Sequence, residues 1–217
     1  MRLTAQVVIL LLVACGMATA YPTSINTMPT AQTAGDRQLL FELANYGYPR
    51  ALRSGSLNCV MFQYGIGPRI EFGVDRYSDS ESAETYWNGK LKVLEENGAT
   101  PDVAVGVMDL ADSQKPSVYA VATKSIGPAR LHAGAIRSSY SHGLMAGVDM
   151  DIGEKLWFGL DYLPGGDNFL RFGAACKLWS DSWLTLSVGA PNDRDVSDTE
   201  IGLTLSTYID LSGGGEL

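Results

Sequence analysis

The chain has 217 residues, of which 46% are hydrophobic, and a formal net charge of −8. This length is enough for one large β domain with its own core, so the fold needs neither a disulfide nor a metal to hold it together. An acidic chain without a sustained basic patch is not expected to bind nucleic acid. No apolar run beyond residue 20 is long enough for a transmembrane helix.

The first twenty residues have the features of an export signal. Arg2 supplies the positive start, residues 7–14 are apolar, and Ala18-Thr19-Ala20 forms a cleavage site before Tyr21. An alternative is a lipobox at Leu12-Val13-Ala14-Cys15, in which Cys15 would become the lipidated first residue. Both alternatives take the chain out of the cytoplasm.

Residues 21–36 are rich in Thr, Pro and Ala and lack any period, so we predict an extended lead-in. An all-β domain is predicted at 37–211, with a flexible tail at 212–217. Its twelve predicted strands are Arg37–Tyr46, Ser56–Tyr64, Pro68–Tyr77, Asn88–Glu96, Pro101–Leu110, Ser117–Ser125, Ala129–Arg137, His142–Ile152, Lys155–Leu163, Asn168–Leu178, Trp183–Gly189 and Thr199–Leu211. Most are near the length that a tilted strand needs to cross a bilayer. One helical turn is predicted at Glu81–Trp87.

The connections between these strands alternate between long and short. The first, third and later odd connections are mostly long and polar, whereas those between them are tight turns such as Gly65–Gly67 and Ile126–Pro128. Membrane barrels have long loops on the outer side and short turns on the periplasmic side, and an even strand count puts both termini on one side.

Seven short runs place a glycine between two apolar residues within segments of period-two alternation. They are Phe72-Gly73-Val74-Asp75, Val105-Gly106-Val107, Ala133-Gly134-Ala135, Ala146-Gly147-Val148-Asp149, Phe158-Gly159-Leu160-Asp161, Phe172-Gly173-Ala174 and Ile201-Gly202-Leu203. One face of each strand is therefore bulky and apolar, while the other carries glycine and charge. This pattern predicts a closed antiparallel transmembrane-type β-barrel with a narrow polar interior, in which glycines leave room for long Arg and Lys side chains.

The inward face defines a predicted lumen charge network of both signs. Its members are Arg69, Glu71, Asp75, Lys90, Lys92, Arg130, His132, Asp149, Asp151, Asp161, Arg171 and Lys177. Charges are costly in lipid and, when unpaired, in a dry core, so a lumen in which they pair or stay hydrated accommodates them. The alternative is a secreted or lipid-anchored soluble β-sandwich or barrel with one solvated face that binds a ligand.

Aromatic residues and cysteines add weaker signals. Tyr and Trp residues fall near several predicted strand ends, as in the aromatic girdles of membrane barrels. Cys59 and Cys176 remain in the mature chain. They could form a disulfide in an oxidising compartment or serve as two small apolar side chains.

No catalytic residue is assigned from the sequence. His132 is predicted to face inward and His142 lies beside Ser138, Ser139 and Ser141, but adjacency in sequence does not place a base against a nucleophile. The acidic stretch 192–200 lacks the glycine and closing glutamate of an EF-hand loop, which favours a solvated loop over a calcium site. No metal or cofactor is predicted, and a lipid-modifying barrel enzyme is the second alternative function.

The segment Ile25-Asn26-Thr27-Met28-Pro29-Thr30-Ala31 and the stretch Lys90–Leu110 resemble parts of YjbH-like, exopolysaccharide-associated outer-membrane barrels. The resemblance implies a bacterial outer-membrane location and envelope polysaccharide as a partner beside membrane lipid. The chain departs from the usual barrel terminus because residues 212–217 end without an aromatic residue. We therefore predict a non-enzymatic outer-membrane β-barrel that has a structural, narrow-passage or polysaccharide-linked role and whose lumen is filled by its own side chains.

Overall fold

The structure is a computed structural model that describes residues 23–47, 57–79, 83–111, 116–138 and 141–212. Its strands are β1 (Gln38–Gly47), β2 (Leu57–Ile66), β3 (Ile70–Ser78), β4 (Ala83–Leu94), β5 (Asp102–Leu110), β6 (Ser117–Ile126), β7 (Ala129–Arg137), β8 (His142–Ile152), β9 (Leu156–Tyr162), β10 (Phe169–Trp179), β11 (Ser182–Pro191) and β12 (Glu200–Asp210). No helix among these residues is long and apolar enough to span a membrane. The predicted export signal and Cys15 lie outside the described residues.

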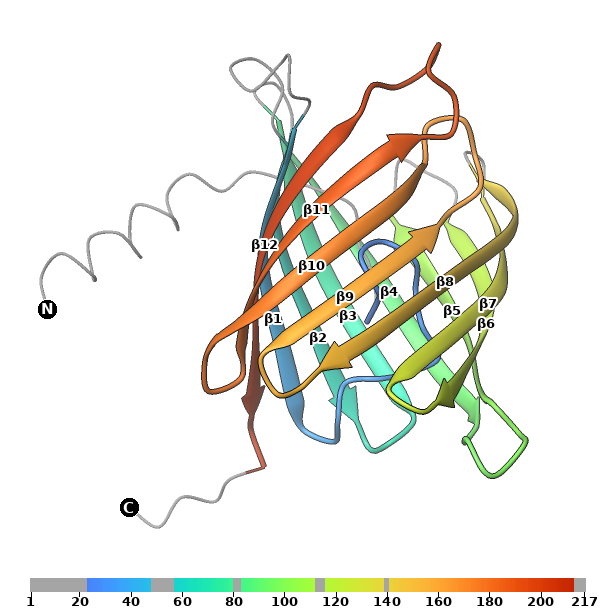
Figure 1. The fold of residues 1–217 in the computed structure, drawn as a ribbon, viewed down its shortest axis with the longest axis vertical. Helices are drawn as coiled ribbons and strands as arrows, with labels where there is room; N and C mark the ends of the chain where they lie inside the picture. The colour runs from blue at the N-terminus through green and yellow to red at the C-terminus, as the bar shows by residue number, and fades with distance from the viewer. Residues whose placement is uncertain (1–22, 48–56, 80–82, 112–115, 139–140, 213–217) are drawn as a thin grey trace, which may run out of the picture.

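The twelve strands close into one antiparallel barrel, which confirms the predicted fold class (Figure 1). Each strand pairs with its neighbours in sequence, and β1 closes the barrel against β12, with Gln38 opposite Asp210 and Gly47 opposite Ile201. Closure pairs every strand on both sides, so no sheet edge is left open. Of the soluble β-sandwich or barrel considered above as an alternative, the sandwich is therefore not formed by the described strands.

The predicted start of the fourth strand and the helical turn at Glu81–Trp87 were wrong for residues 83–87, which belong to β4. Ser78 pairs with Ala83 and Tyr77 with Glu84, so the hairpin continues five residues closer to its loop than predicted. The rings of Tyr77 and Tyr86 pack edge to face, with centroids 5.3 Å apart. These cross-strand contacts stabilise residues 83–87 as part of a strand, although their alternation of apolar and polar residues is weak.

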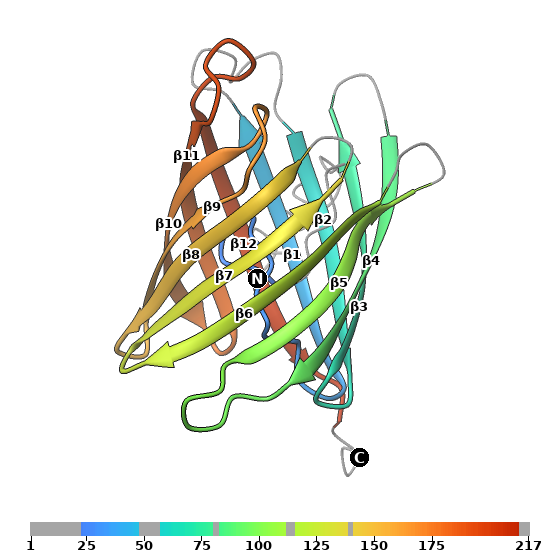
Figure 2. The same cartoon turned by 90° about the vertical axis from the view of Figure 1, so that its right-hand side faces the viewer.

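The two ends of the barrel differ in their connections (Figure 2). Four short turns, such as that between Ile126 and Ala129, lie at one end together with the longer connection between Leu94 and Asp102, the start of β1 and the end of β12. Gly127 has a φ of 58° in that turn, a left-handed conformation that favours glycine. We call this end the short-turn end and the opposite one the long-loop end.

The outer surface of the barrel is apolar. Each strand from β2 to β12 carries at least one large hydrophobic side chain that is more than a third exposed, for example Phe72, Leu144 and Leu186. Cys176 is exposed on this outer surface, whereas Cys59 is buried, and no disulfide joins them. Their positions on opposite faces of the barrel wall explain why two cysteines in separate strands do not meet.

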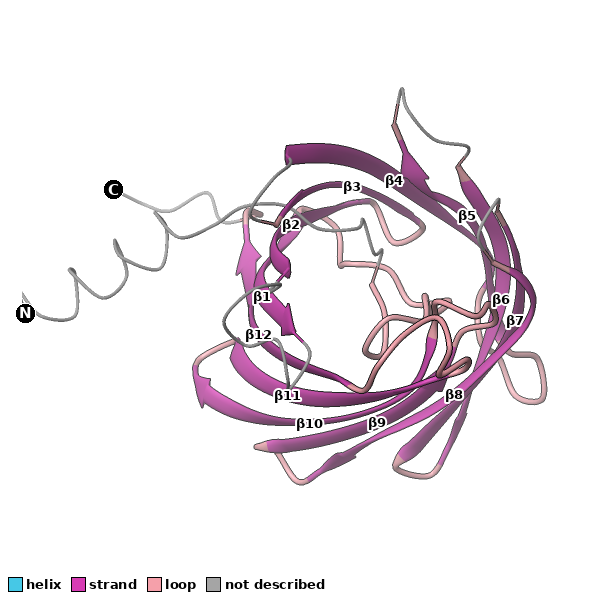
Figure 3. Ribbon diagram, turned by 90° about the horizontal axis from the view of Figure 1, so that it is seen from above, coloured by secondary structure: helices cyan, strands magenta, loops and turns pink. Residues whose placement is uncertain are grey.

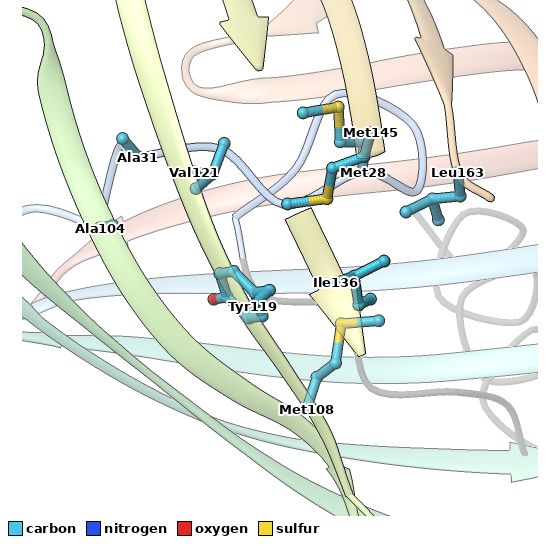
Figure 4. Packing of buried hydrophobic residues seen from close by; sticks show 9 residues of the cluster. All are labelled: Met28, Ala31, Ala104, Met108, Tyr119, Val121, Ile136, Met145 and Leu163. Atoms are coloured by element: carbon cyan, nitrogen blue, oxygen red, sulfur yellow. The ribbon is translucent and has the colours of Figure 1, made fainter. Parts of the chain in front are cut away.

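Residues 23–34 lie inside the barrel, and we call them the plug (Figure 3). Residues 35–37 connect the plug to the start of β1 at the short-turn end. On one side of the plug, Met28 and Ala31 are fully buried in a cluster with apolar residues of β5–β8 and with Leu163, which follows β9 (Figure 4). The other members of this cluster are Ala104, Met108, Tyr119, Val121, Ile136, Met145 and Leu163. The lumen is therefore filled largely by a folded segment of the chain as well as by strand side chains.

Candidate functional site: the barrel lumen

The plug is folded on itself. The amide of Ile25 donates to the carbonyl of Met28 at 3.1 Å, and that of Thr30 donates to the carbonyl of Thr23 at 3.0 Å. The Thr30 hydroxyl donates to the same Thr23 carbonyl at 3.1 Å. These bonds form a tight loop that satisfies part of the backbone internally, so the remaining amides need partners from the barrel wall.

Asp161 of β9 holds the tip of this loop. One carboxylate oxygen accepts hydrogen bonds from the amides of Thr27 and Met28, at 3.0 and 2.7 Å, and from the Thr27 hydroxyl at 3.0 Å. The other oxygen accepts one from Asn26 Nδ2 at 2.5 Å. Asp161 is 1% exposed. A buried carboxylate is tolerated here because four donors from the plug compensate its lost hydration.

Glu71 of β3 and Lys90 of β4 hold the two ends of the plug. Their side chains are fully buried, with Lys90 Nζ 3.3 Å from the Glu71 carboxylate. Glu71 accepts from the amides of Thr23 at 2.8 Å and Ala34 at 2.7 Å, and also from the Thr23 hydroxyl. Lys90 donates to the carbonyls of Thr23 at 3.1 Å and Gln32 at 2.5 Å. The two charges thus neutralise each other, and the pair binds both amide and carbonyl groups of the plug backbone.

A third anchor is a series of three side chains on β6, β7 and β8. The amide of Ala31 donates to Thr123 Oγ1 at 3.0 Å, and that hydroxyl lies 2.9 Å from His132 Nδ1. His132 Nε2 lies 2.7 Å from the Asp149 carboxylate, which also accepts from Arg130 and from Trp157 Nε1. A hydroxyl, an imidazole and a carboxylate in this order are also the groups of a nucleophilic hydrolase. Here the plug covers the hydroxyl, and Thr123 is 1% exposed.

Glycines on the inner wall make room for the plug. A Cβ atom at Gly147 or Gly159 would lie 2.4 Å from the Ile25 side chain, and one at Gly173 would lie 1.8 Å from Asn26 Oδ1. The expectation that these glycines accommodate long Arg and Lys side chains was therefore wrong, because the space they leave is occupied by residues 25 and 26. Their small size allows a strand wall and a chain segment to approach closely.

A cavity of about 320 Å³ remains between the plug and the inner faces of β1, β11 and β12. We call these three inner faces the cavity wall, and the inner faces of β3–β9, which hold the anchors, the plug wall. The cavity-wall residues that line the cavity are Leu40, Glu42, Tyr46, Trp183, Thr185, Ser187, Thr204, Ser206 and Tyr208. Plug residues 23–26 and Gln32 line it from the opposite side, with further contributions from Met61, Arg130, Asp149, Asp151, Trp157 and Ala175.

The predicted lumen charge network falls into two groups in the structure. The buried members are Glu71, Asp75, Lys90, His132, Asp149, Asp161 and Arg171. The partly or largely exposed members are Arg69, Lys92, Arg130, Asp151 and Lys177. The exposed group lies near the short-turn end and pairs there, as Arg69 does with Glu95 at 2.9 Å and Lys92 with Asp102 at 3.7 Å.

Ion pairs also reinforce the rim at the short-turn end. Lys124 donates to Glu96 at 2.6 Å, and the amide and hydroxyl of Ser125 donate to the same carboxylate. The hydrogen bond from Lys124, followed by those from Ser125, holds the pKa of Glu96 below its ordinary value. This contact ties the connection after β4 to the end of β6.

Sequence reasoning missed several lumen residues. Glu42 lies on the inner face of β1, and Glu200 at the start of β12 accepts a hydrogen bond from Arg171 at 2.6 Å. Gln63 and Asn88 donate to Asp75. The alternation of Leu40, Glu42, Ala44 and Tyr46 was the signal available for Glu42. Among the described residues, no three His, Cys, Asp or Glu side chains gather to hold a metal ion.

The barrel is similar in fold to solved porin structures. A KdgM porin in complex with disordered oligogalacturonate superposes with a TM-score of 0.61 and 11% identity, covering 77% of this chain and 98% of that one. A second KdgM porin structure gives a TM-score of 0.60 and 10% identity over the same shares. The chain has the fold of these porins. An outer-membrane channel from Pseudomonas putida F1 covers 88% of this chain at 13% identity, with a TM-score of 0.48.

Sequence comparisons add no relative. No family model matches the chain. No curated protein matches it either. The resemblance to YjbH-like exopolysaccharide-associated barrels is not supported by these comparisons, whereas the barrel fold is.

Proposed function

We propose that the protein is an outer-membrane β-barrel that provides a narrow passage for small polar solutes and has no enzymatic activity. The observation that carries this proposal is the cavity of about 320 Å³ that the plug leaves beside the cavity wall. An interior with both polar lining and open space serves to bind or pass a solute, because a purely structural barrel of this size can be filled by side chains alone.

The outer surface supports a membrane location. Large apolar side chains cover β2–β12 on the outside, and the buried charges all lie on the inside. The apolar area of this surface would far exceed that of the largest exposed patch on a typical soluble monomer. In a bilayer the same surface faces lipid. Membrane lipid is thus one partner of the proposed function.

The charges that line the cavity argue against a polyanion as the solute. Glu42, Asp149 and Asp151 contribute three carboxylates to the lining, against the one guanidinium of Arg130. The galacturonate chain named for the similar KdgM porin is acidic, so the solute of this barrel differs in charge. Envelope polysaccharide remains a proposed partner only in neutral or basic form, for which the hydroxyl and aromatic lining is suited.

The series Thr123–His132–Asp149 is the strongest argument for the alternative, a barrel enzyme. We favour an anchoring role because the Ala31 amide occupies the Thr123 hydroxyl and the plug covers it. A hydrolase would need substrate access to that hydroxyl. Lipid-modifying activity that disappears on replacement of His132, in a chain with intact folding, would reverse this preference.

The plug provides the test of the proposed passage. The full chain would be reconstituted in planar bilayers and compared with a variant in which residues 23–34 are replaced by a Gly-Ser linker of equal length. The linker keeps the chain connected to β1 and removes every anchor contact. We expect small, steady conductance for the full chain and a several-fold rise for the variant. Equal conductance of the two would contradict the proposal, provided that both migrate as folded barrels on unboiled gels.

A further inference from the structure

Glu42 is a carboxylate of the cavity wall that no described cation neutralises. It lies on β1, lines the cavity, and accepts a hydrogen bond from the Ser206 hydroxyl at 2.5 Å. None of the ion pairs among the described residues includes it. On the plug wall, by contrast, Glu71 has Lys90 and Asp149 has Arg130. A carboxylate in a narrow lumen that has a hydroxyl but no cation as its protein partner is available to a ligand of opposite sign.

The residues paired across the strands beside Glu42 carry hydroxyl groups or aromatic rings. Glu42 pairs with Ser206 of β12, which pairs with Trp183 of β11. One inward position further along, Thr204 pairs with Thr185. Tyr46 and Tyr208 flank this group on the same wall, and the ring of Trp157 lines the cavity from β9. Hydroxyls that exchange hydrogen bonds and rings that offer flat faces suit a small polyhydroxylated ligand.

The remaining charges favour a cation over an anion. Arg130 lines the cavity, but its guanidinium binds Asp149, with Nε 2.9 Å from the carboxylate, and Asp151, with Nη1 at 2.6 Å. The plug residues that line the cavity, 23–26 and Gln32, are neutral. The lining therefore keeps an excess of negative charge.

We propose that this cavity binds a small hydroxylated amine, an amino sugar by chemical class, whose ammonium group pairs with Glu42. The inference rests on the proposed passage and names its solute. The ammonium would take the position that a lysine takes beside Glu71 on the plug wall. The hydroxyls of Thr185, Thr204 and Ser206 would meet the sugar hydroxyls, with Trp183 beside the ring.

The test is an equilibrium titration of the full chain in detergent. Binding is measured by calorimetry and by tryptophan fluorescence, to which Trp157 and Trp183 of the cavity lining contribute. Glucosamine, glucose and glucuronate serve as probes of similar size that carry an amine, a hydroxyl and a carboxylate. At a pH at which the amine is protonated, we expect glucosamine to bind about tenfold more tightly than glucose. Glucuronate should bind most weakly.

The variant Glu42→Gln keeps the shape of the side chain and removes its charge. It should reduce the preference for glucosamine over glucose to near unity. The control Glu84→Gln removes a carboxylate from β4 that does not line the cavity and should keep the preference. Equal binding of the three probes by the unaltered chain, or tighter binding of glucuronate, would overturn the proposal even if a variant failed to fold.

Titration and conductance separate this inference from the proposed passage. Amine-selective binding without any rise in conductance on plug replacement would retain the site and reject the passage. A rise in conductance without amine preference would retain the passage and reject an amino sugar as its solute.

Discussion

The plug wall and the cavity wall share the same period-two alternation but carry different inward side chains. On β3–β9 these include ion pairs and carboxylates, and three of the charged side chains, Glu71, Lys90 and Asp161, bind the plug directly. On β1, β11 and β12 they are mostly hydroxyls and aromatic rings, and the lining there borders open space. One side of the lumen is therefore built to hold a chain segment, and the other to leave room beside it.

The contrast follows from what an irregular segment requires. Residues 23–34 have no helix or sheet partner for most of their amides and carbonyls, so burial is favourable only where the wall supplies strong donors and acceptors. Charged side chains meet that need, and the plug in turn compensates their burial. Hydroxyl groups make weaker bonds and remain hydrated without a partner, so a wall made of them does not draw the plug across the lumen.

The largest effect is expected at Lys90. Replacement by Met leaves the buried Glu71 carboxylate without its cation, which costs about 3–5 kcal/mol in the free energy of unfolding. The measurement is the urea concentration at which the folded band on an unboiled gel is lost. The double variant Glu71→Gln with Lys90→Met should recover part of the loss. On the cavity wall, Thr185→Val should change the same free energy by about 0.5 kcal/mol or less. Equal losses of unfolding free energy in Lys90→Met and Thr185→Val would contradict the difference between the plug wall and the cavity wall.

Asp161 separates plug docking from barrel stability. In Asp161→Asn the side chain presents an amide to donors of Thr27 and Met28, so several bonds to a charged group are lost. We expect hydrogen exchange at these two amides to rise about 10- to 100-fold, with conductance rising as well. Glu42→Gln is the control, because its hydrogen bond partner is Ser206 rather than the plug. Plug exchange that rises as much in the control would show that the two walls are not independent.

The glycines give a steric version of the same comparison. A Cβ at Gly159 would lie 2.4 Å from both Ile25 Cγ2 and the Trp157 ring, whereas one at Gly89 meets nothing closer than 3.9 Å. Gly159→Ala should displace Ile25 and raise exchange across residues 23–28 by a smaller factor than Asp161→Asn. Gly89→Ala should leave that exchange unchanged. If Gly159→Ala left the hydrogen exchange of residues 23–28 unchanged, the plug would have more room than its packing against the wall indicates.

The barrel was predictable because its pattern is local. Alternation of apolar and polar residues fixed which residues of β8–β10 face the lumen, and the alternating loop lengths indicated the two ends. The start of β4 was missed because residues 83–87 alternate poorly and are held by their pairing with β3. The lumen residues Glu71, Asp149 and Asp161 could be named from their faces alone.

The plug could not be predicted, because its contacts join residues far apart in the chain. Asp161 binds Thr27 across 134 positions, and nothing in the Thr- and Pro-rich segment indicates where it will lie. The inward glycines were visible in the sequence, but the segment that fills the space beside them was not. Likewise, the hydroxyls of Thr204 and Ser206 could be placed on an inner face, while the space in front of them depends on where the plug stops.

The smallest effect is expected at Thr123, where one hydroxyl links the Ala31 amide to His132. Thr123→Val keeps the shape of the side chain but leaves that buried amide and the imidazole Nδ1 without this partner, which costs about 1 kcal/mol. Exchange of the Ala31 amide should therefore rise about fivefold, whereas Thr123→Ser, which keeps the hydroxyl, should stay close to the unaltered chain. If Val and Ser behave alike, the series on β6–β8 does not anchor the plug. Its hydroxyl, imidazole and carboxylate would then need a different explanation, and the chemistry of a hydrolase would be the first to test.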